Sequence, residues 1–398
     1  MRKFFYWIYG VSIVFLFLRC AERSENVLEQ ILKSSDEKIQ RVLKNRDRHE
    51  IQILYTQIER DSLNNPQFKE WSYGLDEAHY FYPASTAKLP IAILALEKLN
   101  ALQQKGIPID MHTPFHIHDP KTGQPIAQTD TTHVNGSLTI GHLIKKIFLV
   151  SDNDAYNYLF DFLGRDAINQ RLQTIGLKNT QIHHKFLFGA DNDQTWEYTF
   201  LSNDNTLYHQ TSMKSVSTDN NRHLKGILKG SGYYSNRDLI NKPMDFSIKN
   251  RISIKDLNGI LQRILFPEVF EVHQRFTLSD ADYEFLRFWM SRNTLESTAP
   301  NYRTNDYWDS YVKFFMYGDT KGEMTDAIRI YNKVGEAYGT LTDVAYIQNK
   351  EAGVEYMLTA TVLVNDNGIF NDDIYEYESV GIPFLAALGR AVYDYEMQ

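Results

Sequence analysis

Strand-like segments lie at both ends of this chain, and helical patterns fill the middle. Runs of β-branched and aromatic residues predict strands over 51–58 and 68–81 near the start, and over 327–331, 339–348 and 354–364 near the end. Apolar residues at helical spacing predict helices over 26–44, 89–102, 137–162 (with a break near Ser151), 253–265, 280–291 and 383–395. Neither end alone supplies enough strands for a sheet. We therefore expect the two ends to pair in one sheet of an α+β fold.

Composition narrows the class of protein. The chain has 398 residues, 43% of them hydrophobic, which is enough for one large domain or two interleaved ones. Its net charge of -8 repels phosphate backbones and argues against a nucleic-acid partner. Its one cysteine, Cys20, excludes an internal disulfide.

The first twenty residues are typical of an export signal. Arg2 and Lys3 precede an apolar run over 4–18, which is shorter than a membrane-spanning helix needs, and Cys20 follows it. This arrangement resembles a bacterial lipoprotein signal, in which the cysteine is lipidated, although Arg19 replaces the usual small residue. An ordinary or uncleaved export signal and a buried N-terminus are the alternatives. We expect 1–20 to direct export to the periplasm or cell envelope, with a lipid anchor on the membrane, and 21–398 to form the catalytic domain.

A motif at the start of the helix over 89–102 brings a hydroxyl and an amine together. Ser85 and Lys88 are three residues apart, and residues at this spacing share one helix face. A serine hydroxyl needs an adjacent base to act as a nucleophile, and a lysine serves when burial or a nearby cation lowers its pKa. Alone, the motif is more often a plain helix start with Ser85 as cap.

Two further motifs follow in the chain. In Ser151-Asp152-Asn153, a second hydroxyl can relay a proton and an amide can orient a substrate. In Lys333-Val334-Gly335, a lysine at the end of a strand can hold an anion, and the glycine lets a substrate backbone approach. Alone, the former is commonly a helix cap, and the latter an edge-strand lysine before a turn.

The order of the three motifs resembles class A β-lactamases and penicillin-binding proteins. The flanking residues 82–84, 89–91, 138–140 and 339–345 are similar too, so the resemblance covers roughly 26–395. It implies an antiparallel five-stranded sheet built from both chain ends and flanked by helices, plus an all-helical lobe over about 107–301. An insertion of loops or a flap interrupts it at about 187–246, where periodicity is weak.

The resemblance also implies an acyl-enzyme mechanism without cofactor or metal. Lys88 activates Ser85, whose amide forms an oxyanion hole with the backbone amide of Glu336. Ser151, helped by Lys333, passes a proton to the leaving nitrogen. Asn153 and Gly335 contact the substrate.

Two departures from the family pattern concern the substrate carboxylate and the deacylating base. Val334 replaces a threonine or serine that helps to bind the carboxylate of the drug. Phe186 stands where the family has its deacylating glutamate, and Glu197 is the nearest alternative in the sequence. If Glu197 is not the base, then either Lys88 serves both steps or deacylation is slow, as in a penicillin-binding protein.

Two further patterns have a simpler interpretation. Lys121-Thr122-Gly123 matches the third motif of the family letter for letter, but it precedes Ser151 and has the sequence of a surface turn. His116, His118 and Asp119, like His183 and His184, offer too few ligands for a metal site.

Three functions remain open at this stage. The first is hydrolysis of β-lactams, and the second is a related cell-wall peptidase or esterase. The third is a non-catalytic envelope protein that binds ligands. The partner is accordingly a small β-lactam or a cell-wall peptide, and the sequence does not fix an oligomeric state.

Overall fold

The computed structural model describes residues 26–398 except 34–35, 204 and 305. The predicted export signal and Cys20 lie outside the described residues. Within the described part of the chain, no helix combines the length and apolar character needed to cross a membrane.

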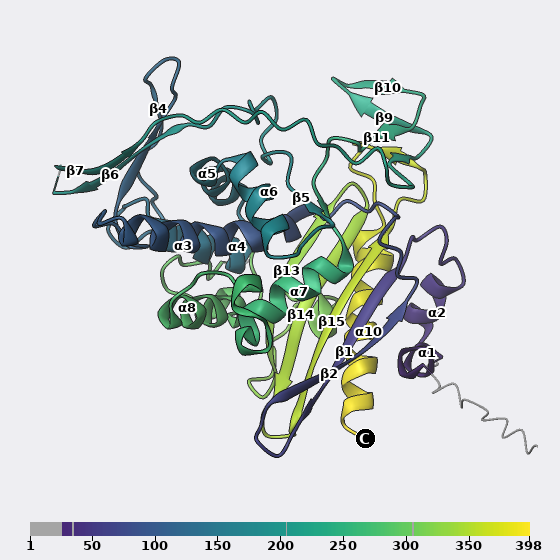
Figure 1. Ribbon diagram of the computed structural model, residues 1–398. Helices are drawn as coiled ribbons and strands as arrows, with labels where there is room; N and C mark the ends of the chain where they lie inside the picture. The colour runs from purple at the N-terminus through teal and green to yellow at the C-terminus, as the bar shows by residue number, and fades with distance from the viewer. Residues whose placement is uncertain (1–25, 34–35, 204, 305) are drawn as a thin grey trace, which may run out of the picture.

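A five-stranded antiparallel sheet joins the two ends of the chain, as expected (Figure 1). Its order is β13-β14-β15-β1-β2. The strands are β1 (Gln52–Arg60), β2 (Pro66–Tyr73), β13 (Arg329–Ala337), β14 (Thr340–Asn349) and β15 (Val354–Leu363). The two ends meet where β1 pairs with β15, with Ile53 opposite Ala360.

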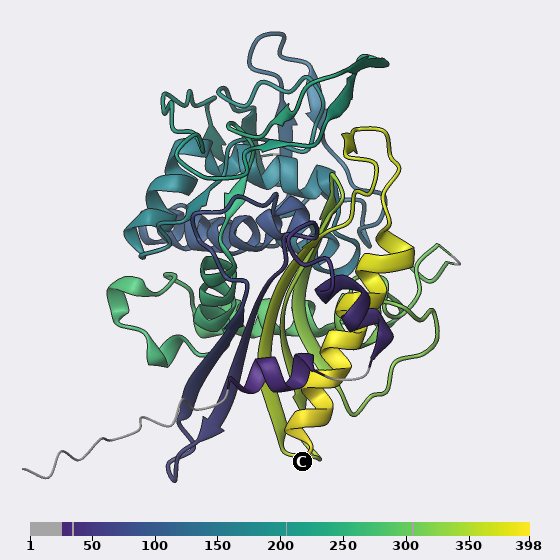
Figure 2. The same ribbon diagram turned by 90° about the vertical axis from the view of Figure 1, so that its right-hand side faces the viewer.

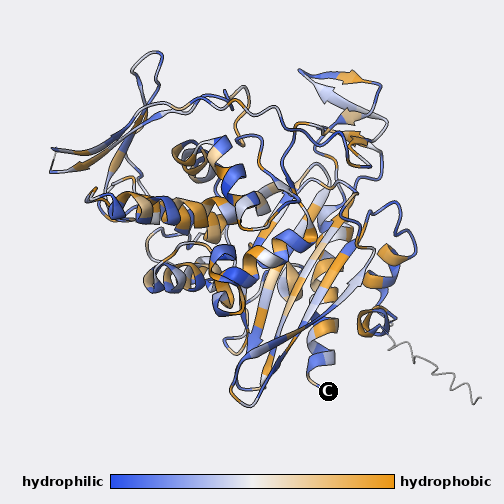
Figure 3. Cartoon of the chain, in the orientation of Figure 1, coloured by the Kyte–Doolittle hydropathy of each residue, from blue (hydrophilic) through white to orange (hydrophobic). Residues whose placement is uncertain are grey.

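Side chains alternate between two cores along these strands. In β1, Leu54 packs with the helical lobe, while Ile53 and Tyr55 pack with the C-terminal helix α10 (Ile382–Glu396). This is the period of two that a strand imposes, with both faces covered. Figure 2 shows α10 along one face of the sheet, and Figure 3 shows apolar residues concentrated in the sheet and in the helices against it.

Two boundaries near the N-terminus differ from expectation. In place of one helix over 26–44, the chain forms α1 (Val27–Leu32) and α2 (Glu37–Leu43), because the Asp36 carboxylate caps a new helix start by accepting from Lys38 N at 2.8 Å. Strand β2 ends at Tyr73 instead of continuing to residue 81. The next residue, Gly74, has a φ of 64°, and a Cβ there would lie 2.2 Å from the carbonyl oxygen of Ile51.

The second lobe is helical at its centre but not throughout, which corrects the expectation of an all-helical lobe. Its helices are α3 (Lys88–Gln104), α4 (Ile140–Val150), α5 (Asn153–Leu163), α6 (Arg165–Thr174), α7 (Ile254–Leu265) and α8 (Asp280–Ser291). A sheet of order β4-β3-β6-β7 flanks them, built from β3 (Phe115–His118), β4 (Pro125–Ala127), β6 (Glu197–Ser202) and β7 (Asn205–Gln210). Strands β5 (Thr180–Gln181) and β12 (Arg251–Ile252) form a further short pair.

Segment 187–246, predicted as an insertion, holds β6, β7 and four short strands. These are β8 (Leu228–Lys229), β9 (Gly232–Ser235), β10 (Asp238–Ile240) and β11 (Met244–Asp245). Strand β9 pairs in parallel with β16 (Ile369–Phe370), which lies just before α10. Gly230 allows this contact, since a Cβ there would lie 2.3 Å from the carbonyl oxygen of Gly368. Segment 187–246 is thus joined to the C-terminal part of the chain.

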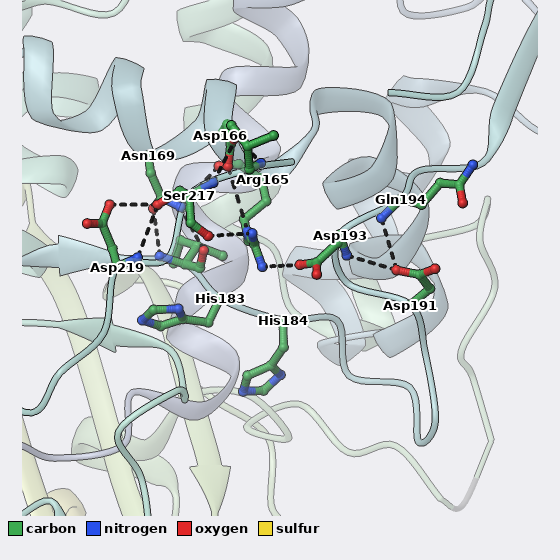
Figure 4. A network of polar contacts seen from close by, with 12 residues as sticks. Arg165, Asp166, Asn169, His183, His184, Asp191, Asp193, Gln194, Ser217 and Asp219 are labelled. Carbon is green, nitrogen blue, oxygen red and sulfur yellow. Dashed lines mark hydrogen bonds and ion pairs between the residues drawn. The ribbon is translucent and has the colours of Figure 1, made fainter. Parts of the chain in front are cut away.

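Two ion pairs hold the start of this segment to the lobe. Lys185 Nζ lies 2.9 Å from both carboxylate oxygens of Asp161, and both side chains are almost completely buried. Farther along, Arg165 at the start of α6 pairs with Asp193, whose side chain is 60% exposed, and also donates to the carbonyl oxygen of Ser217 (Figure 4).

The buried pair should matter far more to stability than the exposed one. We expect Asp161→Asn to lower the free energy of unfolding by about 3–5 kcal/mol, because the buried lysine loses its counter-charge. Asp193→Asn should cost about 0–1 kcal/mol. Urea unfolding followed by tryptophan fluorescence measures both, and equal effects of the two substitutions would contradict this expectation.

Candidate active site

Ser85 lies in a short turn of 3-10 helix (Ala84–Ala87) that leads directly into α3. The preceding residue, Ala84, has a φ of 46°, a left-handed conformation that costs energy for any residue with a Cβ. Thr86 closes the turn, its N–H donating to the carbonyl oxygen of Pro83 at 3.1 Å. The strained turn leaves Ser85 partly exposed at the bottom of a cavity while its neighbours are buried.

Lys88 is one turn farther along and is completely buried. Its Nζ lies 2.8 Å from Ser85 Oγ, 3.2 Å from Ser151 Oγ and 2.7 Å from Asn153 Oδ1. Burial lowers the pKa of Lys88 to about 7, although the carboxylate of Asp152 opposes the shift. A substantial fraction of the amine is therefore neutral at neutral pH and can accept the proton of Ser85.

Ser151 stands between two lysines. It ends α4 in a left-handed conformation, with a φ of 57°, and the chain then turns into α5. This is the expected break, and it directs the hydroxyl toward the amines. Lys333 Nζ lies 2.8 Å from Ser151 Oγ, and Lys88 Nζ lies 3.2 Å from the same oxygen. Ser151 can therefore exchange a proton with either amine.

Lys333 reaches this position from β13, which runs on to Ala337 and does not end at Gly335. Burial, together with the positive charge of Lys88, lowers the pKa of Lys333 well below its usual value. Because like charges this close repel, the two amines do not both carry a full charge at neutral pH.

Gly335 brings β13 against the turn that holds Ser85. A Cβ at Gly335 would lie 2.5 Å from the carbonyl oxygen of Pro83 and 3.1 Å from the amide nitrogen of Ser85. Only a glycine allows this approach. The next residue, Glu336, lines the same cavity as Ser85, so its backbone lies near the nucleophile, as the oxyanion hole predicted from the sequence requires.

A buried lysine behind β13 was not identified from the sequence. Lys313 Nζ donates to the carbonyl oxygens of Met290 and Ile330, at 2.8 Å each, and to Asn332 Oδ1 at 2.7 Å. Asn332 in turn donates to the buried carboxylate of Asp343 at 2.9 Å. These bonds fix the strand immediately before Lys333. A lysine within the apolar run 311–316 was the sequence signal for it.

The cavity above Ser85 has a volume of about 500 Å³. Besides Ser85, Asn153 and Glu336, its lining is largely aromatic: Tyr82, Phe186, Tyr338, Tyr375 and Tyr377. The ring of Phe186 lies 5.1 Å from Lys88 Nζ and stacks on Tyr156. The phenylalanine that the sequence aligns with the deacylating glutamate of the family is thus packed against the lysine.

Glu197 occupies a different part of the molecule. It begins β6 and lies opposite His118 of β3 in the four-stranded sheet. Among the described residues, those that line the cavity above Ser85 do not include Glu197. Its position therefore does not support the prediction that Glu197 is the deacylating base. The resemblance of 196–197 to the family loop is a local pattern and carries no information on the pairing of β6 with β3.

The other patterns from the sequence fall outside the site. Residues 121–123 form the predicted turn between β3 and β4, and Lys121 pairs with Asp191 at 3.2 Å. The ring of His184 stacks on Tyr82, and burial lowers the pKa of His184 to about 4. No group of three metal-ligating side chains is found in the part of the chain that the structure describes.

Comparison of the sequence with known families is decisive for the class of protein. Residues 34–395 match the Beta-lactamase enzyme family. The chain belongs to this family. Membership supports a serine hydrolase that acts on β-lactams, in agreement with the resemblance of the three motifs.

Solved structures are similar in fold but distant in sequence. A structure described as PBP-A is 16% identical with a TM-score of 0.50, and the match covers 94% of this chain and 96% of that one. β-Lactamases from Xanthomonas campestris and Burkholderia phymatum are 16% and 15% identical, each with a TM-score of 0.49. Those matches cover 92% and 94% of this chain and 97% of each relative. No curated protein matches the sequence. At 16% identity, the match to PBP-A supports the fold and not a substrate.

The approach of β13 to Ser85 gives a direct test of the oxyanion hole. We expect Gly335→Ala to lower kcat/KM for a chromogenic cephalosporin by at least about 100-fold, because the new methyl group displaces the Glu336 amide. Gly322→Ala is the control, since no atom lies within 4 Å of a Cβ at that position. Near-normal activity in a folded Gly335→Ala protein would contradict the assignment.

Proposed function

We propose that this protein is a β-lactam hydrolase of the class A type, in which Ser85 is acylated and then released by water. The observation that carries the proposal is the continuous contact from Ser85 through Lys88 to Ser151 and Lys333, each step being 2.8–3.2 Å. A neutral amine beside the nucleophile and a second hydroxyl between two amines supply the proton transfers that opening a β-lactam ring requires.

In the proposed acylation step, each of these residues has its own role. Lys88 takes the proton of Ser85 as Oγ attacks the carbonyl carbon of the lactam. The amides of Ser85 and Glu336 stabilise the resulting oxyanion. When the C–N bond breaks, Ser151 gives its proton to the leaving nitrogen and recovers one from Lys88, which returns Lys88 to its neutral form while Lys333 holds the Ser151 hydroxyl in place.

Deacylation in this protein is assigned to Lys88. Phe186 occupies the region beside the amine where the family has a carboxylate, and Glu197 is elsewhere. After acylation and ring opening, Lys88 is again available as a base. It can take a proton from a water that attacks the ester carbonyl, and it then gives this proton to Ser85 Oγ as the ester bond breaks, which frees Ser85 and the acid product.

The apolar ring of Phe186 also favours a second candidate function. Without a carboxylate to orient the water, the ester on Ser85 is long-lived, as in a penicillin-binding protein. The chain is then a cell-wall peptidase that β-lactams inhibit. The two functions share acylation and differ only in the rate of release.

A time course with a chromogenic cephalosporin separates these functions. We expect steady turnover by the purified protein and a loss of at least about 1000-fold in Ser85→Ala. Intact mass measured during the reaction reports the acyl-enzyme. A single burst with a stable adduct on Ser85 identifies the penicillin-binding alternative, and the absence of both colour and adduct refutes the β-lactam proposal.

The pH dependence tests the base. Because the pKa of Lys88 is lowered to about 7, the neutral, active amine predominates above that pH. We expect the acylation rate to rise as pH increases through about 7 and then to level off. Desolvation and the charge of Glu378 raise the pKa of Glu336 to about 7 as well. Glu336→Gln is therefore the control, and it should leave the midpoint in place. A rate that is flat from pH 5 to 9 would contradict Lys88 as base.

We also propose that the protein is exported and anchored through Cys20, on the basis of the basic start and apolar run before it. The expected result is a mature protein that begins at residue 20 and carries a lipid, detected by mass spectrometry of the membrane fraction. Cys20→Ala should abolish the modification.

A further inference from the structure

A second cavity, of about 920 Å³, adjoins the one above Ser85. The two cavities share Tyr338 and Asn371 in their walls, so they lie side by side. The far wall of the second cavity comes mainly from 187–246 and from the segment 367–374, both outside the three motifs. A substrate bound at Ser85 can therefore extend past Tyr338 into this space.

The far wall of the second cavity is made of paired strands. Strands β9 and β10 form a hairpin whose turn residues, Asn236 and Arg237, both have a positive φ, as a tight hairpin requires. The hairpin pairs with β16, and Asn371 Nδ2 donates to the carbonyl oxygen of Tyr234 at 3.2 Å. Figure 1 shows this small sheet at the upper right, above the end of the large sheet where β13 leads into β14.

An aromatic cluster ties the same wall to the nucleophile. Phe246, which ends segment 187–246, packs on Tyr82, Tyr338 and Phe370 with ring centroids 5.5–6.0 Å apart. Tyr82 lies three residues before Ser85. The position of the second cavity relative to the reacting serine is therefore fixed by packing.

Large apolar side chains in the lining of the second cavity are exposed to solvent. Phe188, Ile374 and Leu239 are 97%, 61% and 43% exposed, respectively, and all three face this space. Large apolar side chains gathered in one exposed hollow indicate a surface that a ligand covers.

The charges in the second cavity favour an anion. Arg237 and Lys249 line it, and neither has a carboxylate partner among the residues that the structure describes; Lys249 Nζ lies 5.6 Å from the centroid of the Tyr338 ring. The one carboxylate in the lining, that of Asp372, accepts hydrogen bonds from Asn367 Nδ2 at 2.7 Å and from the amide of Ile374 at 3.0 Å. The two cations are therefore available to an anionic ligand.

We infer that the second cavity is an extended subsite of the serine centre, which takes an apolar acyl substituent that ends in an anionic group. This inference rests on the proposed function and names the substrates that the site prefers. Val334 lacks the hydroxyl with which the family helps to hold a carboxylate beside the lysine motif, and its side chain is buried in the core of the sheet. Arg237 and Lys249 supply a separate site for an anion, farther from the reacting bond.

The test uses two cephalosporins with the same chromogenic ring system. One carries a neutral phenylpropionyl side chain, and the other carries the same side chain with a para-carboxylate. We expect the KM of the wild-type protein to be about tenfold lower for the charged compound. The double variant Arg237→Gln, Lys249→Gln should remove this difference by raising that KM alone, with kcat within about twofold of wild type.

The matched control is the double variant Arg222→Gln, Lys242→Gln, which removes the same charges from exposed positions of 187–246 that do not line the second cavity. The control should keep the preference. Equal KM values for the two compounds in wild type, or a preference that survives in Arg237→Gln, Lys249→Gln, would overturn the inference.

Calorimetric measurement of binding to the Ser85→Ala protein tests the subsite without requiring hydrolysis. It therefore distinguishes failure of the subsite from failure of the proposed function. If the wild-type protein turns over neither compound, hydrolysis is refuted. The subsite is still supported if Ser85→Ala binds the charged compound about tenfold more tightly and loses this preference with Arg237 and Lys249. Equal binding of both compounds refutes the subsite independently.

Discussion

Two buried lysines lie within hydrogen-bond distance of one serine hydroxyl, and both lobes of the protein position them. The amines of Lys88 and Lys333 lie 3.2 and 2.8 Å from the hydroxyl of Ser151. Burying two like charges together is costly, so the arrangement favours the neutral form of an amine at neutral pH. That neutral form is what a serine nucleophile requires. The chemistry is thus a consequence of where the fold buries its cations, and it calls for no residue with unusual intrinsic reactivity.

The two lobes of the protein contribute different parts of this arrangement. Lys88 and Ser151 come from helices of the second lobe, whereas Lys333 comes from the sheet. Glycine at 335 lets the sheet approach the helical turn, and the hydrogen bonds of Lys313 and Asn332 fix the strand from behind. Since each partner is anchored in its own core, small movements between the lobes would alter the distances on which proton transfer depends.

Much of this could be predicted from the sequence because local patterns determine it. The strands at both ends, the buried helix from Lys88 and the break at Ser151 follow from periodicity, and the three motifs identify the four groups in contact. The sheet of β3 and β6 and the location of Glu197 could not be predicted. Each depends on pairing between segments far apart in the chain, and a local pattern does not carry that information. Asp36 shows a smaller limit, since one capping carboxylate divided a helix that the apolar pattern had predicted as continuous.

The pairing of β1 with β15 has a consequence for the order of assembly. Strand β1 pairs on one side with β15, which lies near the other end of the described chain. Loop closure over nearly the whole chain is slow in comparison with the local contacts of the helical lobe. The lobe can therefore form first, while the hairpin of β1 and β2 waits with an unsatisfied edge. Such an edge is prone to pair with other chains, so a partly folded form in which only the lobe has formed is prone to aggregate.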